Sequence, residues 1–309
     1  MENQCLGLAE ALHLSPVIKR IALRTPWKQF VPFLRHGLRF AFSPQGDLLT
    51  PPWPDLVIAT GRISIPAALY VRQASHKNGI KRALTVQIQN PVIDPLRFDC
   101  VVVPQHDGLS GPNVITTRGA LHRVTQEKLR SEADKLLPTL SHLKSPRIAV
   151  LIGGSSAVYR LTPHEMVPLA AQLAALAKTT GGSLLVTPSR RTGENNIAIL
   201  RQALIGVPSI IWDGKGENPY YGMLGLADYI LVTCDSVNMV SEACTTGKPV
   251  YVIDLPGGSD KFRKFHQILR DSHMTRPFAG TLAPWDYKPL NDVEFVAEKI
   301  RELIEARAQ

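Results

Sequence analysis

Short apolar runs alternate along the chain with longer stretches in which apolar residues recur every three or four positions. A short apolar run between turn residues is typical of a buried β-strand, whereas the longer period is typical of an amphipathic helix. The runs that predict strands span residues 17–23, 55–60, 83–88, 100–104, 147–152, 184–187, 209–212, 229–233 and 249–253. Because helical segments separate these runs, we expect parallel sheets built from βαβ units, and therefore an α/β protein with Rossmann-like domains.

One change of pattern divides the chain in two. The charged helical segment 125–136 runs into Pro138 and a short polar stretch before the next apolar run begins. Because proline ends helices and domain boundaries fall in polar linkers, we place a boundary there. The sequence predicts a first Rossmann-like domain at residues 1–143, a second at 144–285, and a separate C-terminal amphipathic helix within 286–309.

Composition narrows the class of protein. A chain of 309 residues is long enough for two domains of common size. It has no apolar run long enough to predict a membrane span, and its first residues include Glu2 and Glu10 where a secretion signal would carry basic residues. We therefore expect a cytoplasmic protein. The four cysteines are far apart and form no CxxC pair, which argues against a disulfide framework or a zinc ribbon.

The charge of the chain points to anionic partners, because the formal net charge is +9 and the pI is near 9.5. Residues 17–42 carry six basic side chains and no acidic one. On a helical wheel, one face of residues 26–42 is apolar and its edge is basic, and Pro32 would divide the helix into two pieces. The apolar face holds Trp27, Phe30, Val31, Leu34, Leu38 and Phe42, and the edge holds Lys28, Arg35 and Arg39. This pattern predicts a segment that lies on an anionic membrane surface, although the same face would also suit a helix packed against the domain core.

The segment 228–255 carries the clearest candidate chemistry. It predicts a strand, a tight loop at Asp235 and Ser236, a helix that ends near Gly247, and a second strand. Ligands of parallel α/β sheets bind at such strand ends, and the free N–H groups from Ser236 to Met239 would favour an anion. Glu242, about two turns into the helix, would suit a ribose diol. The alternative is that Asp235 or Ser236 is an ordinary N-cap and Glu242 a solvated side chain.

Polar groups follow the other strands of the second domain. Gly153 and Gly154 precede two serines, Ser155 and Ser156, after the first strand, where paired glycines let the backbone approach a ligand closely. The next two strand ends carry Ser189, Arg190, Arg191 and Asn218. Adjacent guanidinium groups suit bidentate binding of a diphosphate. A plain strand-to-helix turn and a solvated basic turn are the alternatives for these loops.

The first domain offers fewer candidates. Arg62, Gln87 and Asp94 follow two of its strands, and His106 beside Asp107 follows the third. A histidine next to a carboxylate suits a general base, although such a dipeptide also occurs in ordinary turns. The chain lacks GxSxG and HExxH sequences, which argues against a serine or zinc hydrolase. It also lacks a pair of aspartates two residues apart, so we expect no required metal ion, and we expect no cofactor. The basic charge comes with no recognisable nucleic-acid-binding motif, so we expect no nucleic-acid partner.

Taken together, these segments resemble a known family, the bacterial relatives of the plant mitochondrial-fission proteins of the ELM type, which are similar to GT-B glycosyltransferases. The resemblance covers nearly the whole chain. It rests on residues 3–12, 51–72, 111–115, 153–162, 184–193, 217–252 and 264–270. Members of this family usually begin with an apolar strand and a Gly-rich loop before the Asn-Gln that stands here at positions 3 and 4. We therefore expect that a first strand of the N-terminal domain is missing from this sequence.

The resemblance implies a fold and a set of roles. It implies two Rossmann-like domains facing across a cleft, with a nucleotide diphosphate sugar in the second domain, the acceptor in the first, and the final helix packing back on the first. By the same resemblance, Ser236 and its neighbours would meet the diphosphate, Glu242 the ribose, and residues 153–156 the cleft side of the donor. Arg62, Gln87 and Asp94 would then lie on the acceptor side. Two functions stay open: metal-independent, inverting glycosyl transfer to a membrane-associated acceptor, or a non-enzymatic membrane-associated scaffold on the same fold.

Overall fold

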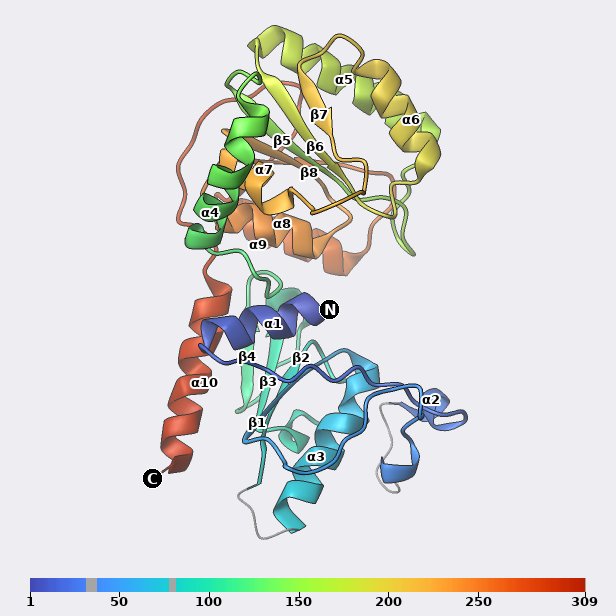
Figure 1. The fold of residues 1–309 in the computed structure, drawn as a ribbon, viewed down its shortest axis with the longest axis vertical. Coiled ribbons are helices and arrows are strands. Elements are labelled where there is room, and N and C mark those ends of the chain that lie inside the picture. Colours follow the sequence, from blue (N-terminus) through green and yellow to red (C-terminus); the bar gives the residue numbers. More distant parts are fainter. Residues whose placement is uncertain (32–37, 78–81, 309) are drawn as a thin grey trace. The chain divides into compact units, whose positions relative to one another are not determined.

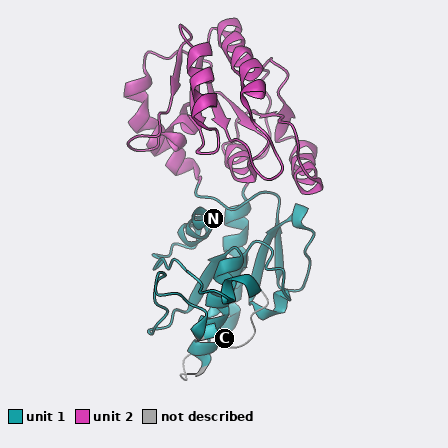
Figure 2. Cartoon of the chain, turned by 90° about the vertical axis from the view of Figure 1, so that its right-hand side faces the viewer, with its two compact units in different colours: residues 1–123, 291–309 teal, residues 124–290 magenta. Residues whose placement is uncertain are grey.

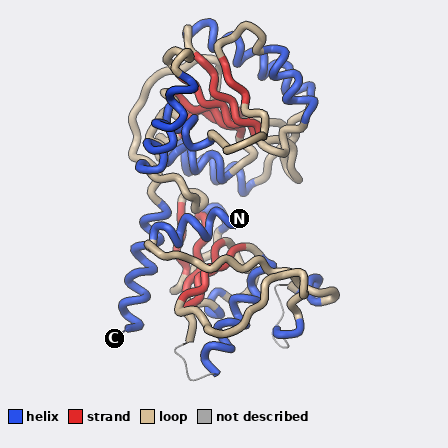
Figure 3. The backbone as a smooth tube through the Cα atoms, in the orientation of Figure 1, coloured by secondary structure: helices blue, strands red, loops and turns tan. Residues whose placement is uncertain are grey.

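The computed structural model of the protein describes residues 1–31, 38–77 and 82–308. The chain forms two compact units, residues 1–123 together with 291–309, and residues 124–290 (Figure 2). Each unit contains one sheet whose strands all run parallel, with helices packed against it (Figure 3). The α/β fold with two Rossmann-like units that the sequence predicts is therefore confirmed.

Unit 1 is built on a four-stranded sheet in the order β1-β2-β3-β4. The strands are β1 (Leu56–Thr60), β2 (Leu84–Ile88), β3 (Cys100–Pro104) and β4 (Val114–Thr117). Its helices are α1 (Glu2–Ala11), α2 (Trp27–Phe30), α3 (Ile65–Lys77) and α10 (Asp292–Ala308), with short 3-10 helices at Leu38–Phe40, Arg62–Ser64, Pro95–Arg97 and Gln105–Asp107. Figure 1 shows α10 running beside the sheet that the first part of the chain forms.

Alternation along β3 explains how both faces of this sheet are buried. Val101 and Val103 belong to one apolar cluster, which also contains Leu69 of α3. Cys100 and Val102 belong to another, which contains residues of both α1 and α10. Because successive side chains of a strand point to opposite faces, α3 covers one face, and the first and last helices cover the other.

Unit 2 is built on a six-stranded sheet in the order β10-β9-β8-β5-β6-β7. The strands are β5 (Arg147–Ile152), β6 (Ser183–Pro188), β7 (Ser209–Ile211), β8 (Tyr229–Thr233), β9 (Val250–Ile253) and β10 (Thr275–Pro277). The helices are α4 (Gln126–Leu136), α5 (Pro163–Thr180), α6 (Glu194–Ala203), α7 (Tyr220–Leu226), α8 (Val237–Thr245) and α9 (Asp260–Asp271), and a 3-10 helix spans Leu137–Leu140.

The strand order of unit 2 fixes where a ligand would bind. The chain proceeds from β5 outward through β6 and β7, then returns to β8 on the other side of β5 and proceeds outward through β9 and β10. Right-handed crossovers therefore place α5 and α6 on one face of the sheet and α8 and α9 on the other (Figure 1). The reversal lies between β5 and β8, and the crevice outside the carboxyl ends of such strands is the usual binding place.

Most predicted strands match the structure to within about a residue at each end, and β3, β5 and β8 match at both ends. The strand predicted at 17–23 is wrong. Val17 and Ile18 are exposed, by 82% and 46%, and only Leu23 forms a bridge, to Phe42. A single bridge cannot bury an apolar run, so the segment stays irregular. The short strands β4 and β10 were not predicted.

The basic segment 26–42 is described in part. Leu34 of the predicted apolar face and Arg35 of its basic edge lie within 32–37, outside the described residues. In the remainder, Phe30 is 59% exposed whereas Leu38 is 4% exposed. Phe42 packs against Tyr70 with ring centroids 5.4 Å apart. The described apolar side chains are thus divided between solvent and the core of unit 1. Within the described ranges, no helix is both long and apolar enough to cross a membrane.

The compact units divide at other residues than the predicted domains. Helix α4 belongs to unit 2, because it packs closely against α7. A Cβ atom added at Gly225 of α7 would overlap the carbonyl oxygen of Leu129 in α4, so the two backbones lie in direct contact. Unit 2 therefore begins at residue 124 instead of 144 and ends at 290 instead of 285, while α10 lies in unit 1.

Candidate functional site

The loops that follow β5, β6 and β8 are tied together at the carboxyl edge of the sheet in unit 2. The Gly153 N–H donates to Thr233 Oγ1 at 2.8 Å, and the Gly154 N–H donates to Asp235 Oδ2 at 3.1 Å. From the β6 loop, Ser189 Oγ donates to the Gly153 carbonyl at 2.8 Å. The backbone of the glycine pair is thus held by residues of both neighbouring loops.

Glycine is required at both positions by this close approach. A Cβ atom at Gly153 would overlap both carboxylate oxygens of Asp235, and a Cβ atom at Gly154 would overlap the carbonyl of Arg191. The paired glycines predicted to approach a ligand therefore approach the neighbouring loops of the protein itself. Their physical effect is to bring the β8–α8 loop against the β6–α6 loop.

Arg191 and Asp235 form an ion pair across the same edge. Arg191 Nη2 lies 2.7 Å from Asp235 Oδ2, and the side chains are 41% and 0% exposed. Arg191 Nη1 also donates to the Gly154 carbonyl at 3.3 Å. The sequence paired Arg191 with Arg190 as diphosphate ligands, but the structure engages Arg191 with a buried carboxylate. Within the described part of the chain, Asp235 Oδ1 has no hydrogen-bond partner.

The serines of the β5–α5 loop hold their own loop. Ser155 Oγ accepts the Leu161 N–H at 3.0 Å, and Ser156 Oγ accepts the Tyr159 N–H at 3.1 Å. Both residues are exposed, yet each hydroxyl already closes a turn. Their predicted role as ligand donors would require these hydroxyls to serve the loop and the ligand together.

Helix α8 presents its first turn at the point where the strand order reverses. Ser236 is the N-cap, and its hydroxyl accepts the Met239 N–H at 3.3 Å. Met239 is half-buried against the main apolar cluster of unit 2. Ser236 is therefore an N-cap, as the alternative interpretation of the sequence predicts. This cap satisfies one of the N–H donors of the first turn.

Glu242 is buried, with 9% of its surface exposed, and the hydroxyl of Tyr220 donates to its Oε2 at 2.6 Å. Burial raises the pKa of Glu242 to about 7, against the lowering effects of the Tyr220 hydrogen bond and the charge of Lys128. The Lys128 ammonium lies over the ring of Tyr221, 4.2 Å from its centroid. Glu242 is therefore not the solvated side chain of the alternative reading, and α4, α7 and α8 all contribute to its surroundings.

Two further candidates of unit 2 lie at its surface. Arg190 and Asn218 are both exposed. Asn218 Oδ1 accepts the Tyr220 N–H at 3.1 Å and so helps to start α7. Arg190 forms no hydrogen bond or ion pair with any residue that the structure describes, which leaves its guanidinium in water at the strand end.

The candidates of unit 1 are mostly engaged in local structure. His106 Nε2 lies 3.7 Å from Asp107 Oδ1, and their side chains are only 2% and 6% exposed, so a substrate could not reach this pair as it stands. Gln87 is buried and donates to the Ile88 carbonyl at 2.9 Å. Asp94 accepts the Leu96 N–H at 3.0 Å as the cap of a 3-10 helix, and Arg62 is exposed.

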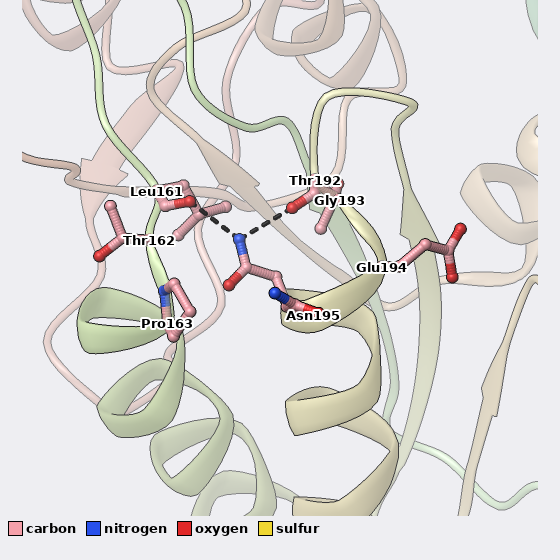
Figure 4. A pocket seen from close by; sticks show the side chains of 8 residues that line it. Leu161, Thr162, Pro163, Thr192, Gly193, Glu194 and Asn195 are labelled. Atoms are coloured by element: carbon pink, nitrogen blue, oxygen red, sulfur yellow. Dashed lines mark hydrogen bonds between the residues drawn. The ribbon is translucent and has the colours of Figure 1, made fainter.

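An open pocket of about 460 Å³ lies between the N-terminal ends of α5 and α6 (Figure 4). It is lined by Leu161, Thr162, Pro163, Thr192, Gly193, Glu194, Asn195 and Asn196. None of the residues singled out by the sequence as ligand contacts lines it. The Thr-Pro and Gly-Glu-Asn sequences did signal two helix starts, but only the fold shows that these starts face one another.

Comparison with known proteins gives the family. The sequence model of the family described as "Mitochondrial fission ELM1" matches residues 1–304. The chain belongs to this family. The resemblance found in the sequence is thereby confirmed.

Two relatives are similar to this chain over most of its length. It is 32% identical over 289 residues to "Mitochondrial fission protein ELM1" of Arabidopsis thaliana, and the alignment covers 82% of this chain but only 65% of the plant protein. An uncharacterized protein of Rickettsia prowazekii is 27% identical over 288 residues, which cover 80% of this chain and 79% of that protein. Among solved structures, UDP-GlcNAc 2-epimerase from Neisseria meningitidis, bound to UDP-GlcNAc, has 14% sequence identity and a TM-score of 0.45, covering 81% of this chain and 76% of that one.

Proposed function

We propose that unit 2 binds a nucleoside diphosphate sugar, without a metal ion, at the carboxyl ends of β5, β6 and β8. One observation carries the proposal: the loops after these strands are fastened to one another where the strand order reverses, so that the first turn of α8 is fixed at that point. Helix N-termini attract phosphate, and doubly wound sheets bind nucleotides in this position.

The described contacts divide the roles among the residues. Because Asp235 already neutralises Arg191, Arg190 is the one of these two arginines that would meet a diphosphate, since it is exposed at the same strand end. The positive end of the α8 dipole, at the first turn of that helix, would attract the phosphate groups. Glu242 would meet the ribose only by sharing its carboxylate with Tyr220, whose hydroxyl lies 2.6 Å away.

The reaction that follows from this binding would be inverting transfer of the sugar to a membrane-associated acceptor, in a GT-B-like fold. The acceptor would lie on unit 1, near Arg62, Gln87 and Asp94, and residues 26–42 would meet the anionic membrane. His106 and Asp107 would act as the base only if the buried pair opens to the acceptor.

A second function, that of a non-enzymatic membrane-associated scaffold, is favoured by one observation. Two charged groups of the candidate site have partners within the protein, Arg191 with Asp235 and Glu242 with Tyr220. A site whose charges are already satisfied needs no ligand to be stable. The Arabidopsis relative is named as a mitochondrial fission protein.

Titration calorimetry with UDP, GDP, ADP, CDP and dTDP in the presence of a chelator tests the donor site. We expect at least one of them to bind, and Arg190→Ala to weaken it about tenfold, since a hydrogen bond to a charged group contributes about 1.5 kcal/mol or more. Arg201→Ala, which removes an exposed arginine in the last turn of α6, is the matched control. No heat with any nucleotide would favour the scaffold, and binding that needs Mg²⁺ would overturn the metal-independent part.

A further inference from the structure

The N-terminal end of α6 has free donors that face the pocket between α5 and α6. Its N-cap is Gly193, which has no side chain to cap the helix. Across the described ranges of the chain, no hydrogen bond uses the backbone N–H of Glu194, Asn195 or Asn196. All three residues line the pocket.

The start of α5, on the other side of the pocket, differs. Thr162 and Glu165 form a capping box there, in which the Thr162 N–H donates to the Glu165 carboxylate at 2.8 Å. The α5 end is thus satisfied within the protein. Only the α6 side of the pocket presents a first turn whose three N–H groups have no partner among the described residues.

Asn196 provides the second, independent sign of a ligand. Its Nδ2 donates to the carbonyls of Leu161 and Thr192, each at 2.8 Å, as the dashed lines of Figure 4 show. These two acceptors fix the amide orientation, because the opposite orientation would put oxygen against oxygen. The residue is 5% exposed, and its Oδ1 has no hydrogen-bond partner in the described structure. A buried acceptor of this kind is unfavourable until a donor reaches it.

The two observations specify complementary groups on one ligand. The three N–H groups and the positive end of the α6 dipole suit an oxyanion, and three donors match the oxygens of a phosphate. Asn196 Oδ1 suits a hydroxyl. The carboxylate of Glu194 does not oppose the anion from within the pocket, because its side chain points away from Thr162 and Pro163 (Figure 4).

We infer that the α5–α6 pocket is a binding site for a sugar phosphate, with the phosphate on the first turn of α6 and a sugar hydroxyl on Asn196 Oδ1. The volume of about 460 Å³ lies within the range of small-molecule sites. The apolar side chains of Leu161 and Pro163 would cover one face of the sugar. This site does not depend on the nucleotide site, which uses Arg190 and the first turn of α8.

Proline substitution removes one donor while keeping the helix. Proline is favoured at the first helical position, and Gly193 has ψ 149°, which a following proline accepts. Glu194→Pro therefore deletes one N–H group together with the carboxylate, and Glu194→Ala deletes the carboxylate alone. With glucose 1-phosphate as the probe, we expect Glu194→Ala to bind at least as well as the wild type and Glu194→Pro about tenfold more weakly than Glu194→Ala. Equal affinities of the two variants would overturn the proposal.

NMR titration of the full chain locates the ligand. Glucose 1-phosphate should shift the amide signals of residues 194–196, and it should bind more tightly than methyl phosphate, which has no hydroxyl group. Asn196→Leu should abolish that preference, provided that its melting temperature shows a folded protein. If Asn196→Leu does not fold, two other results test the site: the preference of the wild type for glucose 1-phosphate over methyl phosphate, and the difference in affinity between the two Glu194 variants. Unchanged amide signals at 194–196 would refute the site.

The same samples separate this inference from the proposed function. UDP should shift the amide signals at the start of α8, around Ser236 and Met239. If none of UDP, GDP, ADP, CDP and dTDP shifts these α8 signals while glucose 1-phosphate shifts residues 194–196, the nucleotide proposal falls and the sugar phosphate site stands. If both ligands shift only the α8 amides, the α5–α6 pocket is not a site.

Discussion

We predict that the ion pair between Arg191 and Asp235 stabilises the folded protein against unfolding. Arg191→Ala would leave the carboxylate of Asp235, with 0% of its side chain exposed, buried and without its cation. Breaking a fully buried pair in this way costs about 3–5 kcal/mol, and water that reaches the partly exposed position of Arg191 reduces the cost. We therefore expect Arg191→Ala to lower the free energy of unfolding by about 2–3 kcal/mol.

Two further variants show whether the buried charge is the cause. Asp235→Asn keeps an oxygen that can accept the Gly154 N–H, which now lies 3.1 Å from Asp235 Oδ2. Added to Arg191→Ala, it should restore all but about 1 kcal/mol, because no charge is then left buried. Arg190→Ala is the matched control, since this neighbouring arginine is exposed and makes no hydrogen bond or ion pair with the described residues.

Urea unfolding of the four proteins, followed by circular dichroism, measures these differences. A loss of less than about 0.5 kcal/mol in Arg191→Ala would refute the reasoning, because surface changes are typically that small. A double variant as unstable as Arg191→Ala would also refute it, since the defect would then lie in the packing of the arginine and not in the charge of Asp235.

Three other predictions concern unit 2. Because the pKa of Glu242 is raised from 4.5 to about 7, the folded protein keeps a proton that the unfolded chain releases between these values, so stability is lost as pH rises through this window. In urea unfolding, the free energy of unfolding of Glu242→Gln should therefore increase relative to that of the wild type from pH 5 to pH 8. A difference between the two proteins that stays constant with pH would contradict this. Gly154→Ala should lower the free energy of unfolding by about 3 kcal/mol, because the added Cβ atom would overlap the backbone at Arg191. The control Gly111→Ala, whose Cβ atom would meet only a side-chain methyl group, should lower it by less than about 1 kcal/mol. Equal losses would refute the steric argument. Lys248→Met should lower the melting temperature through a loss of about 2 kcal/mol, because the half-buried ammonium donates to the carbonyls of Leu224 and Gly225 near the end of α7. An unchanged melting temperature would show that these bonds are not needed.

The sequence predicts those elements best whose signal is local. The strands Arg147–Ile152 and Tyr229–Thr233 are mainly apolar and are buried except at their first residue, and both are predicted at their observed ends. The run 17–23 has a similar apolar content but no strand beside it to pair with along its length, and it forms one bridge. Pairing is a tertiary property, so a strand-like run does not ensure a strand.

The candidate site was predictable in its position but not in its contacts. Gly153, Arg191 and Asp235 each follow a strand in the sequence. Because parallel strands bring their carboxyl ends to one edge of the sheet, the sequence predicts that these residues lie near one another. The pairing of Arg191 with Asp235, and of Tyr220 with Glu242, depends on which strand neighbours which and on side-chain reach. The local pattern of residues predicts neither the strand order nor the reach of a side chain. It also does not predict that Asn196 Oδ1 lacks a hydrogen-bond partner in the described structure.

The position of α10 in unit 1 has a consequence for synthesis of the chain. The apolar cluster of Leu8, Val86 and Val102 is completed by Val296 and Ile300, which the ribosome makes only after all of unit 2. At about 5–20 residues per second, roughly 10 to 40 s separate the synthesis of Val102 from that of Val296. During that interval unit 2 can fold while one face of the first sheet is covered by α1 but not by α10. The nascent chain should therefore be most prone to aggregation in the period before its last helix emerges.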